Sequence, residues 1–351
     1  MEYRQLGSTG LKVSALTLGT MTFGGSGKFR LVGDTDAAGV RRQIDMSRDA
    51  GVNLIDTADV YSSGESEEII GEVLAGRTDD LLIATKVRMR MGEGVNDEGL
   101  SRHHVIAGCE ASLRRLRIDH IDLYQVHEWD GLTPLEETLS ALDALVDSGK
   151  VRYVGVSNYA GWQLMKALGI SDMKGLPRFV SQQIYYSLQE RSAEYELLPL
   201  AVDQGLGTLV WSPLAGGLLS GKYRRGQEWP AGSRQVSEWG EPPIYDLEAL
   251  YDTVDALVAI ADERGVTAAE VALAWLLTRP TVASVIVGAR TDEQLAANLK
   301  AAELTLSHEE LHRLERVSRP RLIYPHWHQF ATGIDRMDEA GLALLEQYKA
   351  Q

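Results

Sequence analysis

Short apolar runs alternate with segments of helical periodicity along most of this chain. Eight such runs are separated by segments whose apolar positions recur every three to four residues. The runs cover residues 16–19, 54–55, 81–86, 119–126, 152–157, 179–184, 208–211 and 284–287. Short apolar strands between amphipathic helices predict a parallel sheet covered by helices. Eight similar units favour a closed (β/α)8 TIM barrel over an open doubly wound sheet, which gives no reason for so many similar units.

The helical segments complete this plan. Helices are predicted at residues 35–50, 65–74, 101–116, 134–146, 162–168, 246–264, 268–277 and 307–317. Thr35-Asp36 is the expected N-terminal cap of the first helix, and Pro134 lies in the first turn of the fourth. Residues 3–13 predict an N-terminal β-hairpin with Gly10 in its turn.

Two regions exceed the barrel repeat. A long loop at residues 212–243 follows the seventh strand, and loops of this length in compact domains are usually functional or mobile. A C-terminal extension, about residues 319–351, adds an aromatic loop at 324–330 and a last helix. No shift in composition marks a boundary, so we expect residues 1–351 to form a single domain.

Composition narrows the possible partners. The 351 residues are 44% apolar and 24% charged, as in ordinary globular proteins, and 35 basic against 50 acidic residues give 35 − 50 = −15. This charge argues against nucleic acid or an anionic membrane as a partner. The single cysteine, Cys109, excludes an internal disulfide framework. The N-terminus lacks a signal-peptide pattern and no run of about 18 apolar residues occurs, so we expect a cytoplasmic protein.

Four candidate catalytic residues stand at or just beyond the ends of consecutive predicted strands. Asp56 ends the second strand, Tyr61 follows in the next loop, Lys86 ends the third and His127 the fourth. The carboxyl ends of barrel strands meet at one mouth, so these side chains should converge. Individually, a structural Lys86–Asp56 ion pair and a buried, satisfied histidine are the commoner explanations. The coincidence at successive strand ends favours a catalytic group.

The chemistry of this group predicts proton transfer to a carbonyl. An ammonium ion beside a phenol lowers the phenol's pKa, and Asp56 would hold Lys86 charged and in place. Tyr61 could then act as a general acid, with His127 as a second donor or an orienting contact. A carbonyl that accepts a proton also needs a hydride, which a side chain cannot supply and a nicotinamide cofactor can.

The ordered motifs resemble those of the aldo-keto reductases from Leu6 to about Leu299. They are Leu18-Gly-Thr20, Leu54-Ile-Asp56-Thr-Ala-Asp-Val-Tyr61, Ala84-Thr-Lys86, Gln125-Val-His127, Gly155-Val-Ser157-Asn158, Gln183-Ile-Tyr-Tyr186, Trp211-Ser-Pro-Leu214 and Gly288-Ala-Arg290. Within that family the chain is most similar to the branch of voltage-gated potassium channel β subunits and related bacterial reductases, which share the pattern Ser212-Pro-Leu…Ser220-Gly-Lys222-Tyr.

The resemblance implies NADP(H) lying extended across the barrel mouth, without a Rossmann domain. The nicotinamide end would contact Gly19, Thr20, Met21 and Asp56, with Ser157, Asn158 and Gln183 at the carboxamide and Trp211 stacked on the ring. The pyrophosphate would lie against Ser212, Pro213, Leu214, Ala215, Gly216, Lys222 and Arg234. The adenosine 2′-phosphate end would meet Gly288, Arg290, Gln294 and Asn298. A helix beginning at Thr291 offers its N-terminus to that phosphate. Many family members have proline where this chain has Val287.

Several short motifs resemble known ligand or metal sites but lack residues that such sites require. The stretch from Gly216 to Lys222 approaches a P-loop, but Tyr223 stands where a serine or threonine must ligate magnesium. His103-His104 should be solvated at a helix start. His326 and His328 lack further ligands for zinc, and Cys109 suits an inert core position. No metal site is expected.

The sequence therefore predicts an NADPH-dependent reductase of aldehydes and ketones, with the substrate walled by Phe23, Tyr61, His127, Trp129 and Trp211. Asp130 and residues 324–327 are further candidates for that wall. An NADP(H)-binding, redox-sensing regulatory subunit with little turnover is the main alternative. A third possibility is an enzyme acting on nucleotide-linked keto sugars. A homo-oligomer is compatible with the sequence.

Overall fold

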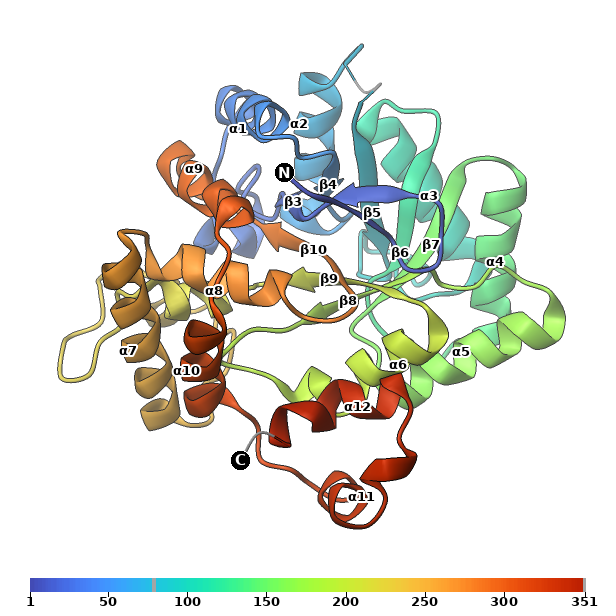
Figure 1. Cartoon of the computed structure of the whole chain (residues 1–351). Helices are drawn as coiled ribbons and strands as arrows, with labels where there is room; N and C mark the ends of the chain where they lie inside the picture. The colour runs from blue at the N-terminus through green and yellow to red at the C-terminus, as the bar shows by residue number, and fades with distance from the viewer. Residues whose placement is uncertain (78–79, 350–351) are drawn as a thin grey trace.

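Eight parallel strands close into a barrel (Figure 1). The computed structural model describes residues 1–77 and 80–349. Strand β10 pairs with both β9 and β3, which closes the sheet and excludes the open alternative. The barrel strands are β3 (Leu16–Gly19), β4 (Leu54–Asp56), β5 (Leu82–Val87), β6 (Ile121–Val126), β7 (Val151–Ser157), β8 (Ser181–Tyr185), β9 (Gly207–Trp211) and β10 (Val282–Val287). The predicted TIM barrel is confirmed.

Helices surround the barrel, as predicted (Figure 1). They are α1 (Ala37–Asp49), α2 (Glu65–Val73), α3 (Arg102–Leu116), α4 (Leu135–Asp147), α5 (Gly161–Lys174), α6 (Leu197–Gln204), α7 (Leu247–Arg264), α8 (Ala268–Leu277), α9 (Asp292–Lys300), α10 (His308–Ser318), α11 (His326–Thr332) and α12 (Glu339–Leu345). Asp36 caps α1 by accepting a hydrogen bond from Gly39 N at 2.8 Å. Pro134 is the N-cap of α4 and not a residue of its first turn.

Two local predictions were wrong. The sequence analysis placed no helix between the sixth and seventh strands, where α6 lies. Its eight residues include Pro199, which lies in the first turn and is compatible with a helix there. The aromatic stretch predicted as a loop at 324–330 largely forms the short helix α11.

The N-terminal hairpin, β1 (Tyr3–Gln5) and β2 (Lys12–Ser14), covers the amino ends of the barrel strands. Gly7 has φ +62°, and a Cβ there would lie 2.5 Å from the carbonyl oxygen of Gly205. Such a close approach to the start of β9 requires glycine at this position. Because the hairpin closes this end, access from solvent is left to the carboxyl ends of the strands, where the candidate catalytic residues stand.

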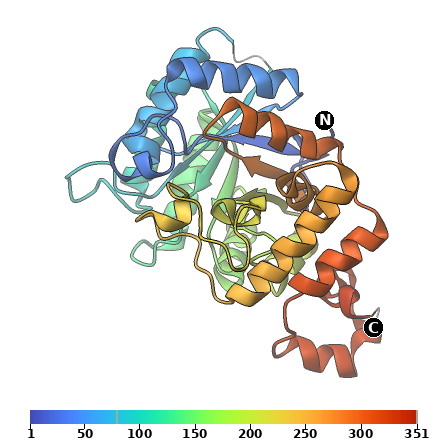
Figure 2. The same cartoon turned by 90° about the vertical axis from the view of Figure 1, so that its left-hand side faces the viewer.

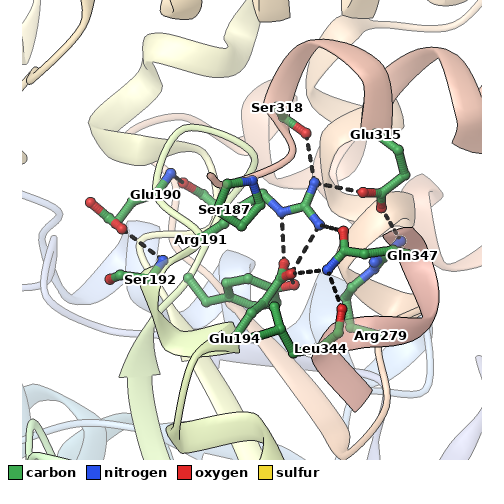
Figure 3. Close-up of polar contacts among 12 residues, drawn as sticks. Ser187, Glu190, Arg191, Ser192, Glu194, Arg279, Glu315, Ser318, Leu344 and Gln347 are labelled. Atoms are coloured by element: carbon green, nitrogen blue, oxygen red, sulfur yellow. Dashed lines mark hydrogen bonds and ion pairs between the residues drawn. The ribbon is translucent and has the colours of Figure 1, made fainter. Parts of the chain in front are cut away.

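The C-terminal extension packs beside the barrel. Helices α11 and α12 project beyond the ring of helices, and α12 lies along α6 (Figures 1 and 2). Arg191, buried in the loop after β8, donates hydrogen bonds to Glu194, Glu315, Ser318 and Gln347 (Figure 3). This buried network joins the end of the extension to the body of the fold. In the described ranges, no helix is long and apolar enough to span a membrane.

Candidate active site

The predicted catalytic residues meet at the carboxyl ends of the strands. The Lys86 ammonium lies 2.5 Å from Asp56 Oδ1 and donates to the Tyr61 hydroxyl oxygen at 3.3 Å. It also donates to the carbonyl oxygen of Thr57 at 2.9 Å, and its side chain is fully buried. Because Lys86 donates to the phenol oxygen, the Tyr61 O–H hydrogen remains free for a ligand in the mouth.

Two glutamines hold the second carboxylate oxygen of Asp56. Gln183 Nε2 donates to Asp56 Oδ2 at 2.8 Å, and Gln125 Nε2 donates to the same atom at 3.1 Å. The carboxylate therefore cannot rotate away from Lys86 without losing these bonds. Gln125 is part of the motif Gln125-Val-His127, but no role was predicted for it from the sequence. Gln125 lies on β6, two residues before His127, which directly follows the strand. This spacing predicts that the two side chains share a face, because alternate strand residues do.

Burial sets the protonation state of the phenol. It raises the pKa of Tyr61, and the neighbouring Lys86 charge only partly offsets this. Lys86 lowers the pKa of Tyr61 as expected, but desolvation is the larger effect and the net pKa is raised. Burial also lowers the pKa of Lys86, but the Asp56 and Tyr61 interactions outweigh it and the pKa is raised. At neutral pH the site thus holds a protonated phenol beside an ammonium ion.

His127 is a neutral imidazole beside this pair. Its burial, followed by the charges of Lys86 and Arg88, lowers the pKa of His127 well below the usual value. The ring lies edge-on to Tyr61, with centroids 6.1 Å apart. Among the described residues its Nδ1 has no hydrogen-bond partner. The imidazole can therefore orient an oxygen through one ring N–H without bringing a further positive charge.

The residues predicted to hold a nicotinamide are adjacent. Trp211 Nε1 donates to Asn158 Oδ1 at 3.1 Å, and Asn158 Nδ2 donates to the carbonyl oxygen of His127 at 3.0 Å. Ser157 Oγ donates to the carbonyl oxygen of Gln183 at 2.9 Å. Tyr185 supports the Trp211 ring at a centroid distance of 4.9 Å. An indole that is supported by Tyr185 and hydrogen-bonded through its N–H offers a fixed flat surface.

Three cations gather near the long loop. Burial, followed by the nearby charge of Arg290, lowers the pKa of Arg234 to about 10. Lys222 likewise has a lowered pKa, through burial and then the charges of Arg290 and Arg234. Neither Lys222 nor Arg234 forms a salt bridge within the described ranges. Like charges held together without an ion pair favour an anionic ligand.

The backbone next to these cations takes the conformation of a tight loop. Ser212, Ala215 and Gly216 all have positive φ, and Ser212 Oγ accepts a hydrogen bond from Gly216 N at 3.1 Å. Pro213 and Leu214 lie within the same turn, before the 3₁₀ segment Ala215–Ser220. A Cβ at Gly217 would lie 3.4 Å from Lys222 Nζ, so the loop backbone passes directly beside the lysine.

Arg290 connects two loops over the mouth. Its guanidinium donates to the carbonyl oxygens of Leu31 and Val32, each at 2.7 Å, and of Gly232 at 3.4 Å. Its backbone N–H donates to Gln294 Oε1 at 3.0 Å. In this structure Arg290 thus bonds the loop after β3 and the long loop after β9, in addition to lying near the other two cations.

The remaining predicted cofactor positions line the seam between β3, β4 and β10. Thr20 Oγ1 donates to the carbonyl oxygen of Asp56 at 3.1 Å, and Gly19 lies so close to β10 that a Cβ would be 2.7 Å from Ile286 Cγ2. Met21, Gly288 and Asn298 lie beyond these, the last on a buried face of α9.

Comparison with known proteins places the chain in a family. Residues 15–319 match the model of the aldo/keto reductase family. The chain is 41% identical over 330 residues to the uncharacterised oxidoreductase YrpG of Bacillus subtilis, covering 90% of this chain and 96% of that protein. It is 38% identical over 312 residues to a probable voltage-gated potassium channel β subunit of Arabidopsis thaliana, covering 87% and 92%. It is 32% identical over 352 residues to versiconal hemiacetal acetate reductase of Aspergillus parasiticus, covering 93% and 99%.

The chain belongs to the aldo/keto reductase family. The family and the names of two of these relatives support an oxidoreductase. The match to the family model ends at residue 319, before α11 and α12.

The predicted substrate wall of this aldo/keto reductase needs correction. Phe23 is fully buried in the core, so its side chain cannot line an open mouth. Phe29 packs against Tyr61 with ring centroids 5.8 Å apart, and Trp239 packs against Phe29 at the same distance. The sequence analysis gave neither residue a role. The sequence gives little indication that Phe29 and Trp239 lie near Tyr61, because both stand in irregular loops that meet only in the folded chain.

The other aromatic candidates lie further out. Trp129 packs edge-on against Tyr159 at 5.2 Å and Trp162 at 5.6 Å, on the outer side of β6 and β7. Tyr324 and Trp327 are largely exposed on or next to α11, at the outer edge of the molecule (Figure 1).

Two minor predictions also have outcomes. His104 is buried and not solvated as expected, because it begins the inner face of α3, whereas His103 is exposed. Cys109 is buried in the same helix, and burial raises the pKa of its thiol to about 12, as suits an inert core position. Within residues 1–77 and 80–349, no group of three or more His, Cys, Asp or Glu side chains could hold a metal ion.

Proposed function

We propose that this aldo/keto reductase is an NADPH-dependent reductase of aldehydes and ketones, with Tyr61 as the proton donor. The observation that most directly supports the proposal is the position of Lys86, between Asp56 Oδ1 at 2.5 Å and the Tyr61 hydroxyl at 3.3 Å. A protonated phenol with a free O–H, at the open end of a barrel, suits a carbonyl oxygen that develops negative charge.

The residues of the mouth fit a dinucleotide. Lys222, Arg234 and Arg290 would neutralise its phosphates, because these cations lie near one another and two of them form no ion pair in the described ranges. Trp211 would supply the flat surface for the nicotinamide, with Ser157, Asn158 and Gln183 at its edge. When bound, the reduced nicotinamide supplies the hydride that no side chain can supply.

Each catalytic side chain then has a defined task. Tyr61 donates its proton to the carbonyl oxygen as the carbon is reduced, and Lys86 stabilises the phenolate that remains. Asp56 keeps Lys86 charged and fixed. Neutral His127 donates a hydrogen bond to the same carbonyl oxygen and sets its position relative to Tyr61. Phe29 and Trp239 shield this oxygen from bulk water beside the phenol ring.

A regulatory role is the second candidate. It is favoured by the similarity to a probable potassium channel β subunit over most of both chains. Such a role requires cofactor binding and little turnover, so it differs from the first proposal in rate and not in the site.

One experiment separates these functions. The protein is mixed with NADPH and a panel of aldehydes, and the absorbance of the reduced nicotinamide is followed. A rate that saturates with aldehyde concentration supports the reductase, whereas tight NADPH binding without substrate-dependent turnover supports the regulator. A nucleotide-linked keto sugar in the same panel tests the third possibility. Absence of NADPH binding would contradict all three.

A further inference from the structure

Arg88 stands one residue beyond the end of β5 in a strained backbone conformation. Its φ is 147°, in the region that side-chain-bearing residues rarely adopt. Its carbonyl oxygen accepts a hydrogen bond from Gly99 N at 2.8 Å, which fixes this geometry. Strained residues that persist next to a catalytic group indicate a functional constraint. Here the catalytic group is Lys86, two residues earlier.

The Arg88 guanidinium has no oxygen acceptor within the described ranges. Its Nε is buried without a partner, and one terminal nitrogen makes only a long contact, 3.8 Å, to the sulfur of Met89. A guanidinium offers five N–H donors in a fork, and leaving buried donors unpaired is costly. The arrangement is stable only if other contacts or a ligand compensate for it.

Asp130, a carboxylate near Arg88, is already hydrogen-bonded to other donors. Asp130 Oδ2 accepts from Leu100 N and from Thr133 Oγ1, each at 2.7 Å, and Oδ1 accepts from Leu132 N at 2.9 Å. Asp130 is close enough for Arg88 to contribute to the lowering of its pKa, yet the two form no salt bridge. Asp130 therefore shapes the loop after β6 and leaves the fork of Arg88 open.

Arg88 also lies close enough to the His127 imidazole for its charge to act on that ring. The charges of Arg88 and Lys86 both act on His127, whose backbone N–H donates to the carbonyl oxygen of Val87 at 3.0 Å. Because the charge of Arg88 acts on His127, the guanidinium lies near the side chain proposed to position the reacting oxygen.

Resting on the proposed reductase function, we propose that Arg88 binds a carboxylate carried by the carbonyl substrate, so that the site favours oxo acids over neutral aldehydes. A guanidinium fork matches the two oxygens of a carboxylate, and that pairing would satisfy the donors that the protein leaves unpaired. The overall charge of −15 opposes the approach of anions. Local attraction by Arg88 and Lys86 at the mouth would offset this.

The test compares two substrates that differ in charge and little else. These are 4-formylbenzoate and its methyl ester. The ester group withdraws electrons more strongly than the carboxylate, so a preference for the acid cannot come from the intrinsic reactivity of its aldehyde. For the wild-type protein, kcat/KM should be higher for the acid. Arg88→Met should lower the ratio of acid to ester kcat/KM by roughly ten- to a hundredfold, the scale of one charged hydrogen-bonded pair, mainly through KM.

Matched variants isolate the effect. Arg88→Lys should keep part of the preference, because it retains the charge without the fork. Arg88→Gly gives a second neutral variant, on a backbone that glycine adopts without strain, if Arg88→Met does not fold. Arg90 is exposed on the same loop and pairs with Glu98, so Arg90→Met should leave the ratio unchanged.

Three results would overturn the proposal. They are a wild-type protein that reduces the ester as well as the acid, an equal loss with both substrates in the Arg88 variants, and a stronger dependence on Arg88 for 4-formylphenyl phosphate than for the acid. If the wild-type protein reduces neither compound, the proposed reductase function fails.

Calorimetric titration of the acid and the ester into the protein, with and without NADPH, then tests whether Arg88 binds the carboxylate. Binding of the acid that is lost in Arg88→Met supports the proposal, and no preference for the acid contradicts it.

Discussion

The side-chain nitrogen of Gln183 lies 2.8 Å from the Asp56 carboxylate, although the two residues are 127 positions apart in the chain. They stand on β8 and β4, on opposite sides of the barrel's closed circle of strands. Together with Gln125 on β6, Gln183 fixes the carboxylate that in turn fixes Lys86. The position of the Lys86 ammonium thus depends on side chains from three other strands, β4, β6 and β8.

Removing Gln125 tests this dependence. Gln125→Leu leaves Asp56 Oδ2 with one donor fewer in a fully buried position, so we expect a loss of about 1–3 kcal/mol in the free energy of unfolding. We also expect kcat to fall by roughly tenfold because Lys86 is held less firmly. Denaturant unfolding and steady-state kinetics measure the two effects. A destabilised variant with an unchanged kcat would show that Gln125 serves the fold alone.

Lys86→Met separates catalysis from a structural ion pair. Loss of the ammonium leaves the buried Asp56 unpaired, which should cost about 3–5 kcal/mol of stability. The double variant Lys86→Met/Asp56→Asn should regain much of that stability. Both variants should remain slow, and their alkaline limit should move to higher pH. Reduction requires a protonated phenol, and Lys86 is the charge that lowers the pKa of Tyr61.

The measurement is a pH–rate profile for both variants, normalised to the folded fraction. If the double variant is stable and reduces aldehydes at the wild-type rate, Lys86 and Asp56 form only a structural ion pair.

The lowered pKa of His127 should make the free energy of unfolding depend on pH. Burial keeps its folded-state pKa well below the ordinary value, so below about pH 6.5 the unfolded chain takes up a proton that the folded chain does not. Stability should therefore fall as pH drops from about 6.5 toward the folded pKa. In His127→Gln this contribution is absent. The stability difference between wild type and variant should shrink by about 1 kcal/mol between pH 7 and pH 5.5. Urea unfolding at both pH values tests this, and a constant difference contradicts it.

We expect Arg290 to make the protein prefer NADPH to NADH. NADPH carries a phosphate on its adenosine ribose that NADH lacks, and one charged hydrogen bond is worth about 1.5–3 kcal/mol. Arg290→Ala should therefore weaken NADPH by roughly ten- to a hundredfold and leave NADH almost unchanged. Because Arg290 also bonds the carbonyl oxygens of two loops, the NADH titration controls for loosening of those loops. Fluorescence quenching measures both affinities. Equal weakening would assign Arg290 to the loops alone.

The barrel could be predicted from the sequence because its signals are local and repeated. Apolar strands that end in Asp56, Lys86 and His127 indicate both the fold and the convergence of the side chains, since a parallel barrel brings all its strand ends together. The signal for a helix cap is also local. The cap of α1 could be predicted because Asp36 accepts a hydrogen bond from Gly39, three residues later.

What could not be predicted depends on contacts between distant segments. Phe29 and Trp239 meet only because two irregular loops fold over the mouth. The raised pKa of Tyr61 reflects the burial of the whole site, which the pairing with Lys86 does not reveal. Phe23 was a candidate for the substrate wall as an aromatic residue, but its ring is fully buried in the core.

The central claim is that Tyr61 gives the proton in an NADPH-dependent carbonyl reduction, and Tyr61→Phe tests it most directly. The substitution removes one hydroxyl and keeps the ring that packs against Phe29. With a reducible aldehyde at saturation, NADPH oxidation should slow by about 10²–10⁴-fold. NADPH affinity should be almost unchanged, because the phenol faces the substrate and not the phosphates. A phenylalanine variant that binds NADPH and turns over at near the wild-type rate would contradict the account.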